Sequence, residues 1–436
     1  MNITIIGTGY VGLVAGASFA KIGHTVLSLD TNEERINNLN NLQLPIFEPG
    51  LKKLVTYSFK RNKLKFSTSY KDGCKNKIIF ICVDTPSKED GQADLSNLIK
   101  VLNSLVPLIR PGTVIITKST VPVGTNDFIE KFFERKIPNN SLKLRFCANP
   151  EFLREGCAVN DFLKPERIII GCNSMSGRKI MQKIYLPLGK AIVKKIIFMS
   201  ISSAELSKYA ANAFLATKIS FVNEIAKLSD KVGANMHEVK AALGTDSRIG
   251  DQFLNAGLGF GGSCFPKDLN ALLSLEKKFQ LRPSIIKTVL EVNHEQLNYF
   301  YTKIKKHYGD SLKHKKLCVW GLSFKPNTDD IRDSMAIQLI FKLSKEVKVL
   351  RLHDPIANKK AKIELSALKN IEFFDDMYEA LHNSDCLVIS TEWTIFSKPD
   401  MAKLSNLKDR IVFDGRNIMD INNLKKHNLI YKGIGC

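Results

Sequence analysis

The fold of this chain is decided at its start, by the stretch NITIIGTGYVG at residues 2–12. The apolar run 2–6 is typical of a buried parallel strand, and we expect a helix over residues 11–22. Between them, Gly7 permits a tight turn, Gly9 lets the backbone approach a pyrophosphate, and Gly12 lets the helix pack closely against the strand. The stretch therefore predicts the first β-α unit of a doubly wound sheet, with a dinucleotide bound at the turn.

The end of the second predicted strand indicates which dinucleotide this is. That strand covers residues 25–29 and is followed by Asp30, 23 residues after Gly7. A carboxylate at this position accepts a hydrogen bond from the ribose 2′-hydroxyl and repels a 2′-phosphate. The positive end of the first helix also favours the phosphates. A glycine-rich turn without a ligand is the simpler alternative, but the strand, the helix and the acid together favour NAD over NADP.

The hydrophobic pattern divides the chain into three parts. The first and the last parts alternate short β-rich runs with helical patterns, and the middle part is helical apart from a glycine-rich segment at 244–262. The pattern predicts an α/β fold, with two doubly wound Rossmann-like domains joined by a central helical segment that contains one long helix at 203–232. The expected domains are 1–195 (NAD-binding), 200–307 (helical, with the glycine-rich segment) and 315–436 (a second Rossmann-like domain). The expected strands are 2–6, 25–29, 78–83, 113–118, 144–148 and 167–171 in a parallel sheet, and 317–320, 347–352, 386–390 and 410–413 in the last domain.

Composition excludes several classes of protein. The chain has 436 residues and a formal charge of +21, but 50 of its 64 basic residues are lysine and they are scattered. Nucleic-acid readers favour arginine, whose planar fork grips oxygens in pairs, so we expect no nucleic-acid partner. The chain has no run of 18 consecutive apolar residues, so no membrane span is predicted. No basic leader precedes the first strand, so we expect a cytoplasmic protein.

The nine cysteines do not form a disulfide or zinc pattern. Their number is odd and none forms a C-x-x-C pair, so we expect reduced thiols, with eight of them small and buried, and no metal. The ninth, Cys264, lies in the stretch GFGGSCFPKD at 259–268. Flexible glycines precede it and Pro266 begins a helix after it. A thiol at a helix N-terminus beside Lys267 is expected to have a lowered pKa and to be nucleophilic, and Asp268 lies one turn further on.

Three further patterns carry candidate functional residues, and the first of them gains weight beside a nucleophile. Lys208 and Asn212 are four residues apart on the predicted long helix, so they share a face, where an ammonium and an amide would stabilise an oxyanion. A solvated helix face is the ordinary interpretation of this spacing alone. The stretch NPEFLREG at 149–156 follows a strand, where ligands bind in doubly wound sheets, so Glu151 is placed for acid–base work. The stretch GLSFKP at 321–326 with Arg332 offers cations to an anionic nucleotide but lacks the triple-glycine turn.

Taken together, these residues resemble the UDP-glucose/GDP-mannose dehydrogenase family, most closely its UDP-glucose-oxidising members. The resemblance covers the whole chain and has two departures, Arg35 where many bacterial relatives carry lysine, and Asp84 where a small residue is commoner. The matching stretches are PIFEPGL (45–51), STVP (119–122), NPEFLREG (149–156), Lys208 with Asn212, FLNAG (253–257), GGSCFPKD (261–268), GLSFKPNTDD (321–330), TEW (391–393) and DGRN (414–417).

The resemblance implies a four-electron oxidation of a sugar nucleotide, UDP-glucose to UDP-glucuronate, with two NAD used in succession. It implies that Cys264 holds the aldehyde as a thiohemiacetal and then as a thioester. The implied catalytic residues are Cys264, Asp268, Lys208, Asn212, Glu151 and Thr120. The implied NAD contacts are Gly7, Gly9, Tyr10, Val11, Gly12, Asp30, Arg35, Thr85, Thr120, Glu155, Lys267 and Arg332. The implied substrate contacts are Glu151, Phe152, Leu153, Arg154, Lys208, Asn212, Arg248, Phe253, Leu254, Asn255, Ala256, Gly257, Gly261 and Lys325, with Arg248 reaching a neighbouring subunit's site.

Alternatives to this interpretation stay open at the level of sequence. The same cysteine chemistry would act on GDP-mannose or UDP-N-acetylmannosamine, and residue types alone do not distinguish the sugar. A non-catalytic NAD-binding protein is a different class, which the joint presence of Cys264, Lys208, Asn212 and Asp268 makes unattractive. The long helix is too apolar around Phe214, Ile219, Phe221 and Ile225 for an exposed linker, so we expect a homodimer or a multiple of one.

Overall fold

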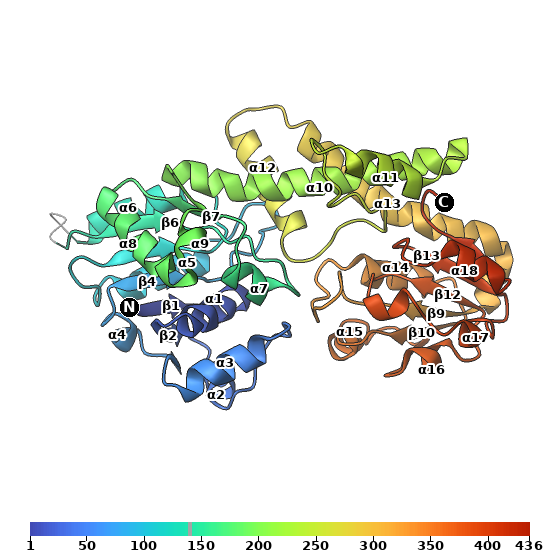
Figure 1. Ribbon diagram of the computed structural model, residues 1–436, viewed down its shortest axis with the longest axis horizontal. Helices are drawn as coiled ribbons and strands as arrows, with labels where there is room; N and C mark the ends of the chain where they lie inside the picture. Colours follow the sequence, from blue (N-terminus) through green and yellow to red (C-terminus); the bar gives the residue numbers. More distant parts are fainter. Residues whose placement is uncertain (138–141) are drawn as a thin grey trace. The chain divides into compact units, whose positions relative to one another are not determined.

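The computed structural model describes residues 1–137 and 142–436, and the chain divides into two compact units, Met1–Ala211 and Asn212–Cys436. Each unit contains one sheet with helices packed on both of its faces (Figure 1). The boundary lies within one long helix, α10 (Ile201–Val232), whose first residues belong to the first unit. This confirms two α/β domains and a long central helix.

The first unit is built on an eight-stranded sheet in the order β3-β2-β1-β4-β5-β6-β7-β8. The chain order reverses between β1 and β4, which is the topological switch point where doubly wound folds bind their ligands. The strands are β1 (Asn2–Ile6), β2 (Thr25–Leu29), β3 (Leu64–Ser67), β4 (Ile78–Ile81), β5 (Val114–Thr117), β6 (Arg145–Ala148), β7 (Ile168–Gly171) and β8 (Ile196–Met199).

Alternate residues of each strand enter two separate cores, because successive side chains point to opposite faces. In β4, Ile78 and Phe80 pack with α1, α3, α7 and α8, whereas Ile79 and Ile81 pack with α5 and α6. The helices are α1 (Tyr10–Lys21), α2 (Glu33–Asn40), α3 (Leu51–Lys60), α4 (Tyr70–Gly73), α5 (Ser96–Leu105), α6 (Thr125–Lys136), α7 (Ala158–Leu163), α8 (Met175–Tyr185) and α9 (Lys190–Val193), with the 3-10 helix η2 (Leu186–Leu188).

The expectation of a wholly parallel first sheet is wrong at one position. β7 runs antiparallel to β6, with Ala148 opposite Gly171, and β8 is again parallel to β7. The apolar run that marks a buried strand is the same for either direction, so composition does not report this reversal. The sequence pattern also missed β3 and β8.

The second unit repeats the doubly wound plan with six parallel strands in the order β11-β10-β9-β12-β13-β14. Leu317 and Val319 of β9 enter one core, with α13 and α14, and Cys318 and Trp320 enter the other, with α16 and α18. The strands are β9 (Lys316–Trp320), β10 (Val349–His353), β11 (Ile371–Phe373), β12 (Cys386–Ile389), β13 (Ile411–Asp414) and β14 (Ile430–Lys432), of which β11 and β14 were not expected.

Most helices of the second unit pack on this sheet, and two of them, α11 and α12, border the glycine-rich segment. They are α11 (Met236–Thr245), α12 (Phe265–Lys278), α13 (Ile285–Tyr308), α14 (Met335–Leu343), α15 (Asn358–Glu364), α16 (Met377–Leu381), α17 (Met401–Leu404) and α18 (Ile421–Lys426), with the 3-10 helices η3 (Gly309–His314) and η4 (Thr394–Phe396). Across residues 1–137 and 142–436, no helix is both long enough and apolar enough to traverse a lipid bilayer.

Candidate active site

The three glycines of the first turn are needed for different structural reasons. Gly7 has φ +99, and a Cβ there would lie 2.6 Å from the carbonyl oxygen of Cys82. A Cβ at Gly12 would lie 1.9 Å from the carbonyl oxygen of Gly7, so the start of α1 packs directly on the turn. At Gly9 the nearest atom is 3.4 Å away, in a side chain, which is an ordinary contact. The protein itself therefore leaves space at Gly9, as a bound pyrophosphate requires.

Asp30 holds this turn in place from the end of β2. Its Oδ2 accepts hydrogen bonds from the backbone N–H of Thr8 at 2.9 Å and from the Thr8 hydroxyl at 2.8 Å. Arg35 Nη1 lies 3.2 Å from the same oxygen. Burial alone would raise the pKa of Asp30, but the hydrogen bonds from Thr8 and Asn32 and the charge of Arg35 outweigh it and hold the pKa below its ordinary value. Asp30 is therefore a carboxylate, as ribose recognition requires.

Other predicted cofactor contacts lie on loops of the same unit. The Thr85 hydroxyl donates to the carbonyl oxygen of Thr120 at 2.7 Å, which joins the loops after β4 and β5. The Tyr10 hydroxyl, at the first residue of α1, donates to the carboxylate of Glu48. The fit of this unit to NAD thus rests on an open Gly9, an ionised Asp30 and ordered loops at the strand ends.

The structure brings together two residues that were predicted separately, Glu151 and Lys208. Lys208 Nζ lies 3.4 Å from Glu151 Oε1, and the two side chains are only 5% and 7% exposed, respectively. Glu151 Oε2 accepts a hydrogen bond from the backbone N–H of Leu153 at 2.6 Å. Each of these two buried groups therefore offsets part of the cost of burying the other.

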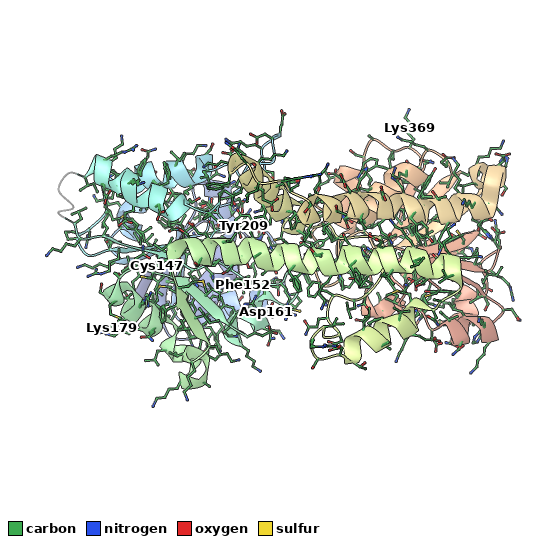
Figure 2. The ribbon with its side chains drawn as sticks, turned by 90° about the horizontal axis from the view of Figure 1, so that it is seen from above. Cys147, Phe152, Asp161, Lys179, Tyr209 and Lys369 are labelled. Atoms are coloured by element: carbon green, nitrogen blue, oxygen red, sulfur yellow. The ribbon has the colours of Figure 1, made fainter. Side chains whose placement is uncertain are left out.

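The rest of the loop that follows β6 is held by side chains on both sides. Arg154 donates to Asp161 through Nε and Nη2 at 3.0 and 2.7 Å, and its backbone N–H donates to the same carboxylate at 2.9 Å. The Arg167 guanidinium carbon lies 4.5 Å from the centre of the Phe152 ring. Phe152 and Asp161 are labelled in Figure 2. The hydrogen bonds between Arg154 and Asp161 therefore stabilise the conformation of this loop.

Two buried residues beside this loop were missed by the sequence analysis. Glu205 accepts from the backbone N–H groups of Gly124 and Asn126 and from the Asn126 amide, at 2.7 to 2.9 Å, and so caps α6 from α10. Burial raises the pKa of Glu205, against the effect of these hydrogen bonds. Lys118 is 4% exposed, and burial lowers its pKa. Only their charge within apolar runs could have signalled them.

A small cavity lies among these groups. Its volume is about 10 Å³, the lower limit for one water molecule. Its lining residues include hydroxyl, amide, carboxylate and ammonium groups, which suits a water that needs several partners. It is lined by Thr117, Ser119, Thr120, Val121, Asn126, Ala148, Pro150, Glu205 and Lys208.

In the second unit, the glycine-rich segment ends at Cys264, the N-cap of α12. Gly262 has φ +81, and a Cβ there would collide with the Phe324 ring at 2.5 Å. A Cβ at Gly261 would lie 2.0 Å from the carbonyl oxygen of Asp333. The glycines thus let the loop pass tightly over the segment that follows β9. The Cys264 thiol is half-buried, with its Sγ 3.7 Å from the Ser263 hydroxyl.

Asp268 is the buried centre of a polar cluster one turn after Cys264. It is 1% exposed, and its backbone N–H donates to the carbonyl oxygen of Cys264 at 2.9 Å. Asn212 Nδ2 donates to its Oδ2 at 2.6 Å, and Lys267 Nζ donates to its Oδ1 at 2.6 Å. The structure therefore places Asn212, predicted as a substrate residue, and Lys267, predicted as an NAD contact, on the carboxylate of Asp268.

The predicted substrate loop 253–257 is rigidly held. Phe253 has φ +63, an unfavourable value for an aromatic residue. The backbone N–H of Gly257 donates to Asn223 at 2.8 Å, and its carbonyl oxygen accepts from Gln296 at 2.8 Å. Leu254 and Ala256 are buried and Asn255 is exposed. A loop with a strained residue at its start and a hydrogen-bonded glycine at its end is typical of a preorganised binding site.

The remaining predicted cations are dispersed over the second unit. Arg248 has an 87% exposed side chain and pairs with Asp246, and Arg332 pairs with Asp330 through two nitrogens. Lys325 is half-buried, 5.3 Å from the centre of the Phe324 ring. The expectation that eight cysteines are buried is wrong for two of them. Cys157, at the N-cap of α7, and Cys436, after the last strand, are exposed because neither is packed between a sheet and its covering helices.

The first turn of the second unit resembles that of the first unit, but the aspartate that follows its second strand accepts many hydrogen bonds from its own chain. Gly321 has φ +98, and Asp354, at the end of β10, has the place that Asp30 has after β2. Asp354 Oδ2 accepts from the backbone N–H groups of Leu322 and Ser323, the Ser323 hydroxyl and the Trp393 indole, at 2.8 to 3.1 Å. Its Oδ1 accepts two more backbone N–H groups. Asp354 thus accepts six hydrogen bonds from its own unit, which tie it to the turn after β9.

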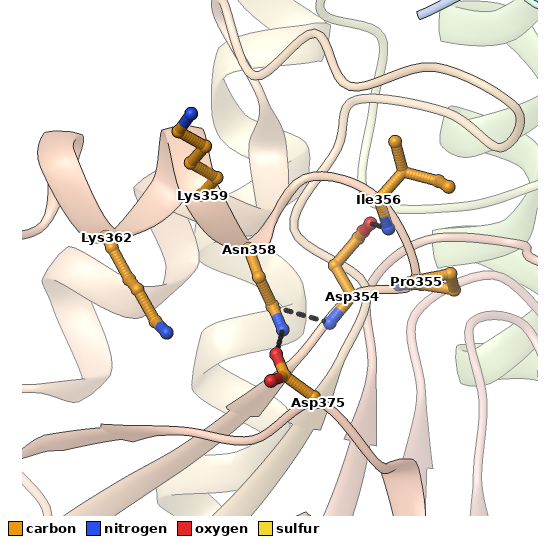
Figure 3. Close-up of a pocket in the computed structure, with 7 residues that line it drawn as sticks. All are labelled: Asp354, Pro355, Ile356, Asn358, Lys359, Lys362 and Asp375. Carbon is orange, nitrogen blue, oxygen red and sulfur yellow. Dashed lines mark hydrogen bonds between the residues drawn. The ribbon is translucent and has the colours of Figure 1, made fainter.

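A pocket of about 410 Å³ adjoins Asp354 (Figure 3). It is lined by Asp354, Pro355, Ile356, Asn358, Lys359, Lys362 and Asp375. Asn358 bridges the pocket wall, accepting from the backbone N–H of Asp354 at 2.9 Å and donating to Asp375 at 3.4 Å. Within residues 1–137 and 142–436, no three His, Cys, Asp or Glu side chains are grouped to hold a metal ion.

The chain is similar to known proteins over its full length. Three family models match, those of the UDP-glucose/GDP-mannose dehydrogenase family, over residues 1–189 (NAD binding domain), 202–295 (central domain) and 318–421 (UDP binding domain). The UDP-glucose 6-dehydrogenase of Rhizobium meliloti (strain 1021) is 40% identical, over 100% of this chain and 99% of its own length.

Two solved structures are also similar over the full chain. A UDP-glucose dehydrogenase from the hyperthermophilic archaeon Pyrobaculum islandicum aligns with a TM-score of 0.90 at 33% identity, covering 100% of this chain and 97% of its own. A UDP-D-ManNAc dehydrogenase from Pyrococcus horikoshii aligns with a TM-score of 0.86 at 25% identity, covering 100% and 99%. The fold and site define an NAD-dependent dehydrogenase. The chain belongs to the UDP-glucose/GDP-mannose dehydrogenase family.

Proposed function

We propose that this protein oxidises the C6 hydroxyl of UDP-glucose to a carboxylate, giving UDP-glucuronate, with reduction of two NAD. The observation that carries the proposal is the nucleophile centre of the second unit. Cys264 caps α12, and the buried Asp268, held by Asn212 and Lys267, lies one turn away. When bound to the first unit, NAD accepts a hydride from the substrate carbon.

Cys264 supports the second half of the reaction. After the first oxidation, its thiolate adds to the aldehyde carbon, and the carbonyl oxygen gains a proton, which gives a thiohemiacetal. Loss of a second hydride and of that proton leaves a thioester, and water then cleaves the carbon–sulfur bond to release the carboxylate and the thiol. The helix N-terminus stabilises the thiolate, and the covalent bond keeps the reactive aldehyde from escaping.

Asp268 and Asn212 serve proton transfer and substrate binding. The hydrogen bonds from Asn212 and Lys267 fix the orientation of the Asp268 carboxylate, which accepts the alcohol proton through a water molecule. Asn212 has two N–H donors and uses one on Asp268, which leaves the other for a substrate oxygen. Lys267 holds the carboxylate in place, a role that we add to its predicted contact with NAD.

Glu151, Lys208 and Thr120 serve hydrolysis of the thioester. Lys208 Nζ lies 3.4 Å from Glu151 Oε1 and holds this carboxylate in the loop, where Glu151 takes a proton from attacking water. A water-sized cavity lined by Thr120 and Lys208 supports this assignment. The family resemblance is also the basis for the remaining substrate contacts that we propose. These are the loop that follows Glu151, residues 253–257, Gly261, Arg248 and Lys325.

The assignment to UDP-glucose is supported over the other sugar nucleotides by similarity. The Rhizobium meliloti relative, named a UDP-glucose 6-dehydrogenase, is 40% identical over the full length, whereas the UDP-D-ManNAc dehydrogenase structure is 25% identical. A binding protein without catalysis would have no need of a cysteine flanked by a buried aspartate. The functional segments that we propose are 1–195 for NAD, 200–307 for dimerisation and the cysteine loop, and 315–436 for the UDP-sugar.

We also propose a homodimer, or a multiple of one, formed along α10. Phe214, Phe221 and Leu228 are spaced by seven residues, so they share one helix face, and they are 67%, 53% and 55% exposed. Ile219 and Ile225, in contrast, pack into the cores of their own chain. We propose a cytoplasmic location, in line with nine cysteines that are all free thiols, and no nucleic-acid or membrane partner.

A panel of UDP- and GDP-sugars with NAD, monitored by NADH absorbance and product analysis, tests this function. We expect UDP-glucose to be the preferred substrate and to yield about two NADH per UDP-glucuronate. GDP-mannose or UDP-N-acetylmannosamine as the preferred substrate would overturn the assignment of the sugar. One NADH with release of free aldehyde would overturn the two-step mechanism.

A further inference from the structure

A buried carboxylate that the proposed reaction does not use lies in the loop between α2 and α3. Glu48 is 5% exposed and belongs to the stretch PIFEPGL at 45–51, to which the sequence analysis assigned no role. A buried carboxylate needs several hydrogen-bond donors to be tolerated. Those donors show what Glu48 holds together.

Three donors from two distant segments meet on Glu48. Its Oε2 accepts from the hydroxyl of Tyr10 and from the backbone N–H of Gly156, the latter at 2.6 Å. Its Oε1 accepts from the backbone N–H of Ala158 at 2.8 Å. Tyr10 follows the open glycine of the dinucleotide turn, and Gly156 ends the loop that begins at Glu151. A single side chain therefore joins the cofactor turn to the loop that carries a proposed catalytic residue.

The chemistry of Tyr10 agrees with a permanent link. Burial first, and then the negative charges of Glu48 and Glu155, raise the pKa of Tyr10 far above its ordinary value, so its phenol remains a donor at all working pH values. Tyr10 and Glu155 are both predicted contacts of NAD. Glu48 accepts a hydrogen bond from Tyr10 itself and another from the backbone N–H of Gly156, which follows Glu155.

We propose that Glu48 is a positioning residue that couples NAD binding to the order of the 151–158 segment. The proposal rests on the use of NAD proposed above. Because Glu48 bonds Tyr10 and Gly156 at the same oxygen, fixing the cofactor turn also fixes the loop, and the free protein is preorganised for the cofactor. Without Glu48 the backbone N–H groups of Gly156 and Ala158 would be buried and unpaired, so the segment would loosen.

The test uses Tyr10→Phe, Glu48→Gln and the double variant of the full-length chain. Tyr299→Phe is the matched control, because Tyr299 also donates to a carboxylate, that of Asp230, in the other unit. Titration calorimetry gives Kd for NAD, and hydrogen–deuterium exchange gives the protection of amides 153–158 with and without NAD. We expect Kd to rise about tenfold in each single variant, the loss typical of one hydrogen bond to a charged group, and no further in the double variant.

Exchange separates positioning from mere stabilisation. In the wild type and in Tyr299→Phe, NAD should protect amides 153–158 as well as the turn at 7–13, whereas in Tyr10→Phe and Glu48→Gln it should protect the turn alone. A lower thermal midpoint with protection of 153–158 retained would overturn the proposal, as would additive changes in Kd. Should Glu48→Gln not fold, Tyr10→Phe decides alone, since it leaves the bonds to Gly156 and Ala158 intact. Failure of the wild type to bind NAD would instead reject the proposed function.

Discussion

Replacement of Asp30 by alanine should change which cofactor the protein prefers. Asp30 Oδ2 accepts two hydrogen bonds from Thr8 and lies 3.2 Å from Arg35 Nη1. The variant loses the acceptor for the ribose hydroxyl, and a hydrogen bond to a charged group contributes ~1.5–3 kcal/mol, or roughly 10- to 150-fold in kcat/KM for NAD. The kcat/KM for NADP should rise, because the carboxylate no longer repels the 2′-phosphate and the Arg35 guanidinium becomes available to bind it.

The assay is kcat/KM for UDP-glucose oxidation with saturating sugar nucleotide and varied NAD or NADP. Asp30→Asn is the matched control, because it keeps the size of the side chain and removes only its charge. We expect the NAD/NADP ratio to fall in both variants, and further in Asp30→Ala. A thermal unfolding scan separates this effect from loss of the Thr8 bonds. An unchanged ratio in a folded variant would refute the assignment of Asp30 to the ribose.

Three further changes test the account. Gly12→Ala should lower the free energy of unfolding in urea by roughly 1–3 kcal/mol, since its Cβ would lie 1.9 Å from a carbonyl oxygen, whereas Gly9→Ala should fold normally and bind NAD poorly; equal stability of the two would contradict this reasoning. Burial lowers the pKa of His24, so its stabilising contribution is complete above a pH of about 6.5 and is lost as the pH falls below that value. The free energy of unfolding should therefore drop between about pH 7 and 5, with a smaller slope in His24→Gln. Phe221→Glu should shift the mass measured by light scattering to the 48.9 kDa monomer, whereas a wild type already of that mass would exclude the dimer.

The interior of both sheets was predictable from the sequence, and their edges were not. β1 and β2 have the predicted bounds, because continuous apolar runs end at Gly7 and Asp30. The four missed strands, β3, β8, β11 and β14, are the four edge strands of the two sheets. An edge strand is covered on fewer sides, and β3, β11 and β14 accordingly mix apolar with polar residues, as in Ile430–Lys432. The fourth, β8, is apolar throughout, so a weak pattern does not explain why it was missed.

The candidate site was predictable where its residues are close in sequence. Cys264, Lys267 and Asp268 form one helix start, so local spacing was sufficient to place them together. Contacts between distant segments were not predictable from spacing. Asn212 lies 56 residues from Asp268, and Glu48 lies 108 residues from Gly156, and only the folded chain brings each pair within hydrogen-bonding distance.

The fate of the substrate at Cys264 tests the central claim most directly. Cys264→Ser and Cys264→Ala are incubated with UDP-glucose and NAD, and the intact protein mass is measured. A serine hydroxyl adds to the aldehyde but is a weak nucleophile and leaves poorly from an ester. We expect a folded serine variant, with turnover lower by several orders of magnitude, that accumulates a covalent ester, and an alanine variant without any adduct. A Cys264→Ala protein that makes UDP-glucuronate at the wild-type rate would contradict the mechanism.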